Sequence, residues 1–246
     1  MTAENLFIEL KNALENIMRE NNMEASRICI SAKTLTPIEA IGETVRKDFP
    51  IIVGKEVMLE AECEGSLGQA FTSAPAHFRG QLKDILALDL MENDYNRGLF
   101  IAALNAVMAR CGLASQTIHC KTEEPELCGK KSVDYLKNHF GTPKIALIGY
   151  QPALIENLSQ HFELRVLDLN PENIGQNRYG IEIEDGIADY EKVTAWAELV
   201  LCTGSTLCNG SIVNFLELEK NLVFFGTTIA GTATLLNLQR MCLCSH

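Results

Sequence analysis

The chain has 246 residues, of which 47% are hydrophobic and 22% are charged, the composition of a globular protein with material for one large or two ordinary domains. Its formal net charge of −11 argues against a nucleic-acid-binding surface, because phosphate contacts depend on clustered Lys and Arg. The first residues lack the basic and apolar regions of a signal peptide, and no apolar run is long enough to cross a membrane. We therefore expect a cytoplasmic protein without nucleic-acid or membrane partners, and a homo-oligomer is compatible with the composition.

Residues 1–112 are predicted to form an α+β domain, in which antiparallel strands precede helices. Asn105, a polar residue in the middle of the last helix, is expected to bond a neighbouring backbone group rather than a ligand. Segment 34–50 is rich in turn-forming residues and has no clear period, and residues 113–131 are interpreted as a domain linker. The predicted elements are a helix over residues 1–22, strands within residues 27–32, 51–63 and 65–75, and helices over residues 81–90 and 94–112.

Residues 132–246 are predicted to form a second, parallel α/β domain. Residues 144–170 read as strand, turn, helix and strand, a βαβ unit that requires a right-handed crossover and a parallel sheet. In such sheets a ligand binds at the carboxyl ends of the strands, so this unit indicates where something binds. The other predicted elements are helices over residues 132–141 and 186–197, and strand–loop–helix units over residues 198–219 and 221–238.

Four predicted strand ends carry glycine, hydroxyl and amide residues, and they converge on one edge of the parallel sheet. Glycine lets the backbone approach a ligand, while Ser and Thr hydroxyls and helix N-terminal amides supply hydrogen-bond donors. We therefore expect a small polar molecule to bind at this edge. The candidate ligand-binding residues are Gly149, Tyr150, Gln151, Asp168, Asn170, Thr203, Gly204, Ser205, Thr206, Thr227 and Thr228.

The first of these turns only partly matches a dinucleotide site. Asp168 lies 19 residues beyond Gly149, near the spacing at which an acidic residue meets a ribose. The GxGxxG fingerprint is missing, because Tyr150 and Pro152 stand where its later glycines would be. Pro152 suits the first turn of a helix but removes an amide from the anion site. NAD is therefore not expected, while another nucleotide-like ligand stays open.

Nine cysteines are a high count for a protein of a reducing compartment, and they suggest buried thiols, metal ligands or redox chemistry rather than disulfides. Cys120 and Cys128 lie in the predicted linker, with His119 adjacent, and Cys242 and Cys244 lie in the tail. If the tail and the linker meet, these four thiols could form one site for zinc, iron or an iron–sulfur cluster. The cysteines interpreted as packing residues are Cys29, Cys63, Cys111 and Cys202.

Four C-terminal segments, IGYQPALIENL, VLDLNPENIG, LCTGSTLCNGSI and the final FFGTT with IAG, resemble the putative heavy-metal chelation family. The resemblance implies a Rossmann-like C-terminal domain joined to an N-terminal domain like that of enolase. The stretches GQAFTSAP and LNAVMAR in the N-terminal half agree with it. It also implies a pocket between the two domains, lined by loops near Gly149, residues 203–206, Asn209 and Thr227. The family was named by conjecture, so the resemblance names no reaction.

The leading hypothesis is a protein that handles a metal ion or a metal-bearing small molecule, with the cysteines as ligands and the Gly/Ser/Thr loops holding a polar portion.

The alternative is an enzyme that acts on a small polar substrate in the interdomain cleft with a nucleotide or S-adenosylmethionine. Asp168 would then contact ribose hydroxyls, and Tyr150 or a cleft thiol would do acid–base work, although no catalytic pair stands at a defined spacing. A third interpretation is an oligomeric scaffold whose cysteines only pack.

Overall fold

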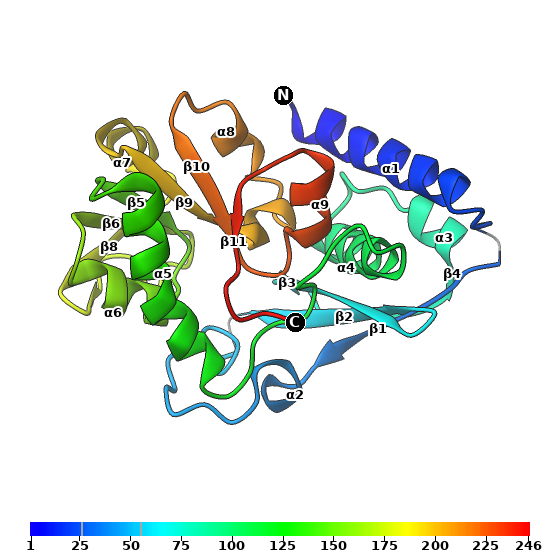
Figure 1. The fold of residues 1–246 in the computed structure, drawn as a ribbon, viewed down its shortest axis with the longest axis horizontal. Coiled ribbons are helices and arrows are strands. Elements are labelled where there is room, and N and C mark those ends of the chain that lie inside the picture. Colours follow the sequence, from blue (N-terminus) through cyan, green and yellow to red (C-terminus); the bar gives the residue numbers. More distant parts are fainter. Residues whose placement is uncertain (26, 55) are drawn as a thin grey trace.

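The computed structural model describes residues 1–25, 27–54 and 56–246, which fold around two β-sheets (Figure 1). The N-terminal half holds an antiparallel sheet and the C-terminal half a largely parallel one, so the fold is the mixed α/β arrangement that the sequence predicts. In the described part of the chain, no helix combines the length and the apolar character needed to cross a membrane.

The antiparallel sheet has the strand order β3-β2-β1-β4. The alternation expected in β2 is present in part, because Leu59 and Ala61 are buried and Glu62 is exposed, while Met58 on the other face is buried too. The elements of this half are α1 (Ala3–Glu20), β1 (Cys29–Leu35), α2 (Pro37–Ile41), β2 (Val57–Cys63), β3 (Ser66–Thr72), β4 (His77–Gln81), α3 (Leu82–Leu86) and α4 (Asp94–Arg110).

Helix α4 is buried along most of its length and packs against β3 and β2. It begins at Asp94, the first residue of its predicted range, and the side chain of Asn93 accepts a hydrogen bond from the amide of Asn96 and caps the helix. The β3 backbone approaches α4 closely at Gly68, where a β-carbon would stand 2.1 Å from the amide nitrogen of Ala106. Glycine is therefore required at this position for the strand and the helix to touch.

The second sheet has the strand order β11-β10-β9-β5-β6-β8-β7, and its neighbours pair in parallel except β7 with β8. The elements of this half are α5 (Glu124–Phe140), β5 (Ile145–Ile148), α6 (Pro152–Ser159), β6 (Leu164–Asp168), β7 (Asn177–Arg178), β8 (Ile181–Asp185), α7 (Tyr190–Trp196), β9 (Leu199–Thr203), the 3-10 turn η1 (Gly204–Leu207), α8 (Val213–Leu216), β10 (Asn221–Phe225), α9 (Ala230–Leu235) and β11 (Arg240–Met241).

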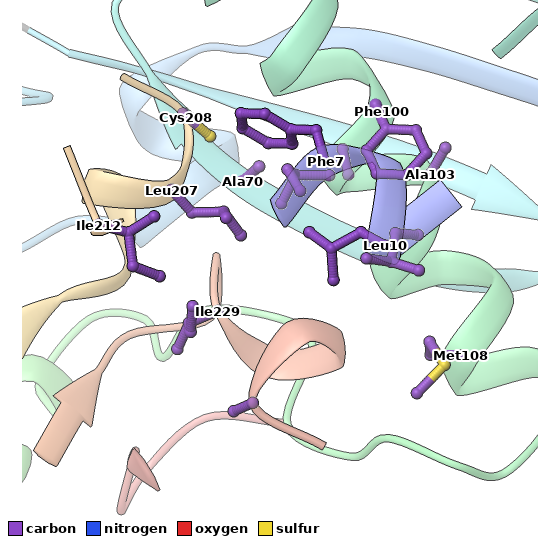
Figure 2. Close-up of a cluster of buried hydrophobic side chains, with 14 of the residues drawn as sticks. Phe7, Leu10, Ala70, Phe100, Ala103, Met108, Leu207, Cys208, Ile212 and Ile229 are labelled. Atoms are coloured by element: carbon purple, nitrogen blue, oxygen red, sulfur yellow. The ribbon is translucent and has the colours of Figure 1, made fainter. Parts of the chain in front are cut away.

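The two faces of the parallel sheet enter different hydrophobic clusters. Ile145 and Leu147 face α5 and α6, whereas Ala146 and Ile148 face a cluster that also contains α1, α4 and the antiparallel sheet. Figure 2 shows this shared cluster, in which Phe7 and Phe100 from the N-terminal half lie near Ile229 and the η1 segment of the C-terminal half. The two halves therefore bury apolar surface against each other and share one core.

Asn105 joins the halves through hydrogen bonds. Its side-chain amide donates to the carbonyls of Gln69, Thr227 and Thr228 over 2.9 to 3.2 Å, and its carbonyl accepts from the amide of Gly231 at 2.8 Å. This buried side-chain amide therefore bonds backbone groups, as expected, and the groups belong to β3, to the loop between β10 and α9, and to the first turn of α9.

Two segments differ from the sequence expectations. Helix α5 begins at Glu124, so the last part of the predicted linker 113–131 is helical; Pro125 stands in the first turn of α5, where proline is tolerated, rather than in a loop. The polar stretch that follows β6, for which no element was predicted, contains the strand β8, which lies between β6 and the edge strand β7. In β8, Ile181 and Ile183 alternate with acidic residues.

Candidate functional site

A cleft of about 800 Å³ lies where both halves of the chain meet, and we call it the outer cleft. Glu56, Thr72 and Asp94 line it from the N-terminal half, and the loops after β5, β6 and β9 line it from the C-terminal half. Because parallel strands end at the same edge of a sheet, these loops gather there. A smaller cavity of about 110 Å³ adjoins it and is called the inner chamber; Glu56 and Tyr150 line both spaces.

The structure brings together most of the predicted ligand-binding residues. Thr227 lines neither space; it is fully buried, and its hydroxyl has no hydrogen-bond partner within the described residues. The predicted residues at the outer cleft are Gly149, Tyr150, Asp168, Asn170, Thr203, Ser205, Thr206 and Asn209. The inner chamber adds Gln151, Gly204 and Thr228.

Gly149 has a structural role that the sequence does not reveal. Its φ is +93°, and a β-carbon there would stand 2.8 Å from Cγ2 of Thr203. The loops after β5 and β9 therefore touch at this glycine, which lets them close together over the strand ends.

Asp168 organises the same edge. Its carboxylate accepts hydrogen bonds from the amide of Tyr150 at 2.7 Å, from the amide of Asn170 at 2.7 Å and from the side chain of Asn173 at 3.3 Å. These bonds tie the loop after β5 to the loop after β6 and hold the negative charge at the cleft wall.

Glu56 is the most unusual group of the cleft. Its half-buried side chain forms no hydrogen bond or ion pair with any residue that the structure describes. Burial, together with the nearby charge of Asp168, raises the pKa of Glu56 to about 7. A carboxyl group with this pKa exchanges its proton near neutral pH, and it lies at the junction of the outer cleft and the inner chamber.

The amide groups at this edge are already used by the protein. The side chain of Gln151 accepts the amide of Leu154 at 2.8 Å and caps α6, while Thr203 Oγ1 accepts the amide of Ser205. No Lys, Arg or His side chain in the described ranges lines the outer cleft. This arrangement offers little to a phosphate group, which is bound through free amides and cationic side chains.

Tyr150 is held by the segment between α2 and β2. Its hydroxyl donates to Asp48 at 3.0 Å, as does the hydroxyl of Tyr179 at 2.7 Å, and burial and the charge of Asp48 raise the pKa of Tyr150. Arg46 on the same segment bonds the carboxylates of Glu126 and Glu156. The network positions Tyr150 as a wall of the cleft and works against its predicted use as an acid or base at neutral pH.

The tail and the linker meet, which was the condition for the predicted four-cysteine site. Ile118 and His246 exchange two backbone hydrogen bonds of 2.8 and 2.9 Å, and Figure 1 shows the C-terminus beside the segment that precedes α5. Cys120, Cys128 and Cys242 line the inner chamber. Cys244 does not line it, and burial is the main cause that raises the pKa of Cys120.

A metal site is not preformed. Within the described residues, no group of three or more His, Cys, Asp and Glu side chains has an arrangement that could hold a metal ion. The chemistry of the donors fits a thiophilic metal, but the tetrahedral set expected for zinc or the four thiolates of an iron–sulfur cluster would require the side chains to rearrange.

The remaining cysteines are placed mostly as expected. Cys63 and Cys202 are fully buried and Cys111 is partly buried, in agreement with packing roles, whereas Cys29 is exposed and is not a packing residue. Its place in β1 explains the error, because the strand alternates and Cys29 falls on the exposed side.

Glu56, Asp48 and Arg46 are the residues of this site that sequence reasoning missed. All three belong to, or border, a segment without periodicity, and their roles depend on contacts with residues 80 to 133 positions away in the chain. No local pattern could have found them.

The chain resembles known proteins in its C-terminal half and in its fold. Residues 133–238 match the DUF364 family, whose description is "Putative heavy-metal chelation", and this confirms the resemblance predicted from the sequence. A DUF364 protein of unknown function from Pyrococcus horikoshii has a similar structure, with 15% identity and a TM-score of 0.52 over 91% of this chain and 79% of its own. A second DUF364 protein of unknown function, from Desulfitobacterium hafniense DCB-2, aligns with 16% identity and a TM-score of 0.46 over 73% of this chain and 72% of its own. No curated protein matches the sequence.

Proposed function

We propose that this protein binds a small, polar, positively charged molecule in the outer cleft, and that the molecule is a metal chelate. The observation that carries the proposal is Glu56, a carboxyl group near Asp168 that has no hydrogen-bond or ion-pair partner among the described residues, in a cleft whose described lining contains no cationic side chain. A cation placed between the two carboxyl groups would relieve their repulsion and favour the ionised form of Glu56.

The rest of the lining suits the outer shell of such a chelate. Thr203, Ser205 and Asn209 present hydroxyl and amide groups that can donate to or accept from bound ligand atoms. A volume of about 800 Å³ holds a molecule of drug size, larger than a bare ion. Either a metal chelate or a simple amine could supply the positive charge. The description of the DUF364 family favours the metal chelate.

The test uses hexaamminecobalt(III), an inert metal complex of charge +3 whose ammine groups donate hydrogen bonds, and citrate as an anionic counterpart. We expect thermal stabilisation by the cobalt complex and none by citrate; a ligand at 100 times its Kd would add about 2.7 kcal/mol. Glu56→Gln should remove most of the effect. The control is Glu15→Gln, which removes the same charge from the exposed face of α1.

Equal stabilisation of the Glu56→Gln and Glu15→Gln variants would mean that the complex binds the acidic surface at large, and it would contradict the proposal. Stabilisation by citrate alone would contradict it too, because an anion would then occupy a cleft that we describe as selective for cations.

A second function is favoured by one observation. A carboxyl group with a pKa of about 7 is suited to transfer a proton at neutral pH, so Glu56 could act as the acid–base group of an enzyme that uses this cleft. S-adenosylmethionine, a cofactor with a cationic sulfonium, is the probe for this alternative. Stabilisation by S-adenosylmethionine that survives Glu56→Gln would favour the enzyme, because the variant would then retain binding and lose only the proton-transfer group.

A further inference from the structure

Three cysteines from three separate segments line the inner chamber. Cys120 belongs to the segment before α5, Cys128 to α5 itself and Cys242 to the tail that follows β11. All three are free thiols. The chamber of about 110 Å³ is much smaller than the outer cleft, so it has room for an ion and its ligating sulfur atoms and not for a large chelate.

We propose that the inner chamber binds one soft, two-coordinate cation, of the monovalent copper or silver class, between Cys128 and Cys242. Thiolates select soft cations, and two sulfur ligands satisfy a monovalent ion of this class. Among the described residues, no three side chains are arranged to ligate a metal ion, which disfavours zinc and iron–sulfur clusters. A site with only two sulfur ligands is compatible with this arrangement. This proposal is independent of the ligand proposed for the outer cleft.

Cys128 and Cys242 are the pair that fits best. Both are partly exposed and line the chamber, whereas Cys120 is buried, with 6% exposure, and its sulfur lies 3.8 Å from Nδ1 of His119. Cys244 does not line the chamber. Cys120 is then the additional thiol that lines the chamber, and the proposal gives Cys244 no direct part.

The backbone brings the two thiols to the chamber from two separate segments, the tail and α5. Met241 pairs with Phe225 in the parallel sheet, and Arg240 donates to the carbonyls of Gly226 and Gln116 at 2.9 and 2.7 Å. Cys128 stands in the second turn of α5, away from the tail in sequence. The backbone of Leu243 in the tail already hydrogen-bonds the Cys128 thiol, and a cation between the two thiols would add a second connection between the tail and α5.

The binding step needs no oxidant. Two S–H bonds break, two metal–sulfur bonds form, and two protons pass to solvent, so a monovalent cation and two thiols give a bis-thiolate complex of charge −1. The oxidation states of sulfur and metal do not change.

The test is an anaerobic competition for monovalent copper supplied as its bis(bicinchoninate) complex, whose colour fades as the metal is transferred. The parent protein is Cys29→Ser, which removes the exposed thiol that could bind metal by itself. We expect this parent to take one copper ion per chain. A further Cys128→Ser or Cys242→Ser change should weaken binding by more than about 100-fold, since loss of a direct ligand exceeds the effect of losing a second-shell partner.

Cys244→Ser in the same parent is the matched control, because it removes a tail thiol two residues from Cys242 without touching the chamber, and its affinity should stay within a few fold. A bound ion should also slow carboxypeptidase digestion of the tail, and this protection should vanish in Cys242→Ser. Cys128→Ala provides a second variant if serine at that position disturbs α5.

Copper uptake unchanged by Cys242→Ser would overturn the proposal. Zinc bound at one ion per chain, with a dependence on Cys244 equal to that on Cys242, would also overturn it and replace it with a four-thiol site. Neither outcome changes the expected response of the outer cleft to hexaamminecobalt(III). The two proposals can therefore be contradicted independently of each other.

Discussion

Glu56 combines partial burial, no polar partner among the described residues, and a neighbouring carboxylate in Asp168. In an unfolded chain its carboxyl group would titrate near its ordinary value of 4.5, whereas in the folded protein the pKa is about 7. The folded state therefore holds this proton more tightly than the unfolded state does. Its contribution to stability is fully present below about pH 4.5 and is lost as the pH rises through about 7.

This difference predicts the behaviour of Glu56→Gln. The amide is neutral at every pH, so the variant should have a higher free energy of unfolding than the parent at pH 8, by about 1–3 kcal/mol after allowance for partial solvent exposure. At pH 5 the two proteins should be nearly equal. Urea unfolding at both pH values measures the effect, with Glu15→Gln as the control. Parallel pH profiles for all three proteins would show that the carboxyl of Glu56 is not perturbed.

At the residue scale, the sequence predicted the polar side chains of the parallel edge and not their tasks. The alternative enzyme interpretation gives Asp168 to a ribose and Tyr150 to acid–base chemistry. In the structure, Asp168 accepts the amides of Tyr150 and Asn170, and the hydroxyl of Tyr150 donates to Asp48. The spacing of residues along the chain indicates which side chains reach the carboxyl edge of the parallel sheet. Their hydrogen-bond partners, in contrast, depend on which distant segment packs over that edge.

At the scale of elements, the contact between β3 and α4 supports the cleft from the N-terminal side. Thr72 at the end of β3 lines the outer cleft, and Asn105 of α4 bonds β3 and the loop after β10. The glycine that lets the two elements touch is Gly68, which faces the helix backbone and has no space for a side chain.

Gly68→Ala should therefore destabilise the protein strongly. The added methyl group would meet helix backbone, which cannot give way, and the expected loss is about 3 kcal/mol or more. Gly98→Ala is the matched control, because its β-carbon would meet only the side chain of Thr72, at 3.1 Å, and helix propensity favours alanine there. Thermal unfolding of the two variants measures the difference. Equal midpoints would show that β3 and α4 are less tightly packed than described.

Strong periodic elements were predictable, and strands that are acidic or only two residues long were not. The long helices α1 and α4 and the buried strands β5, β6, β9 and β10 follow from apolar spacing, since each must bury one face or both. β8 and β11 could not be found in this way, because one alternates with acidic residues and the other is a two-residue strand defined only by its partner β10. The start of α5 was missed because Pro125 signals a loop and a helix start equally well.

For the whole molecule, the two halves share a hydrophobic core, so their packing against each other fixes the walls of the cleft between them. Such long-range packing cannot be predicted from one sequence without knowledge of which faces meet. The contact between the tail and the linker is equally long-range: the cysteines were visible in the sequence, but the backbone pair between Ile118 and His246 spans just over half of the chain.

The central claim is that a cation binds in the outer cleft beside Glu56, and proton release on binding tests it most directly. Isothermal titration of hexaamminecobalt(III) at pH 7, in two buffers of different ionisation enthalpy, gives the number of protons released. A carboxyl group with a pKa of about 7 is half protonated at that pH, so we expect the release of about half a proton per cation bound, and none in Glu56→Gln. Binding without proton release, or equal release by both proteins, would contradict the account.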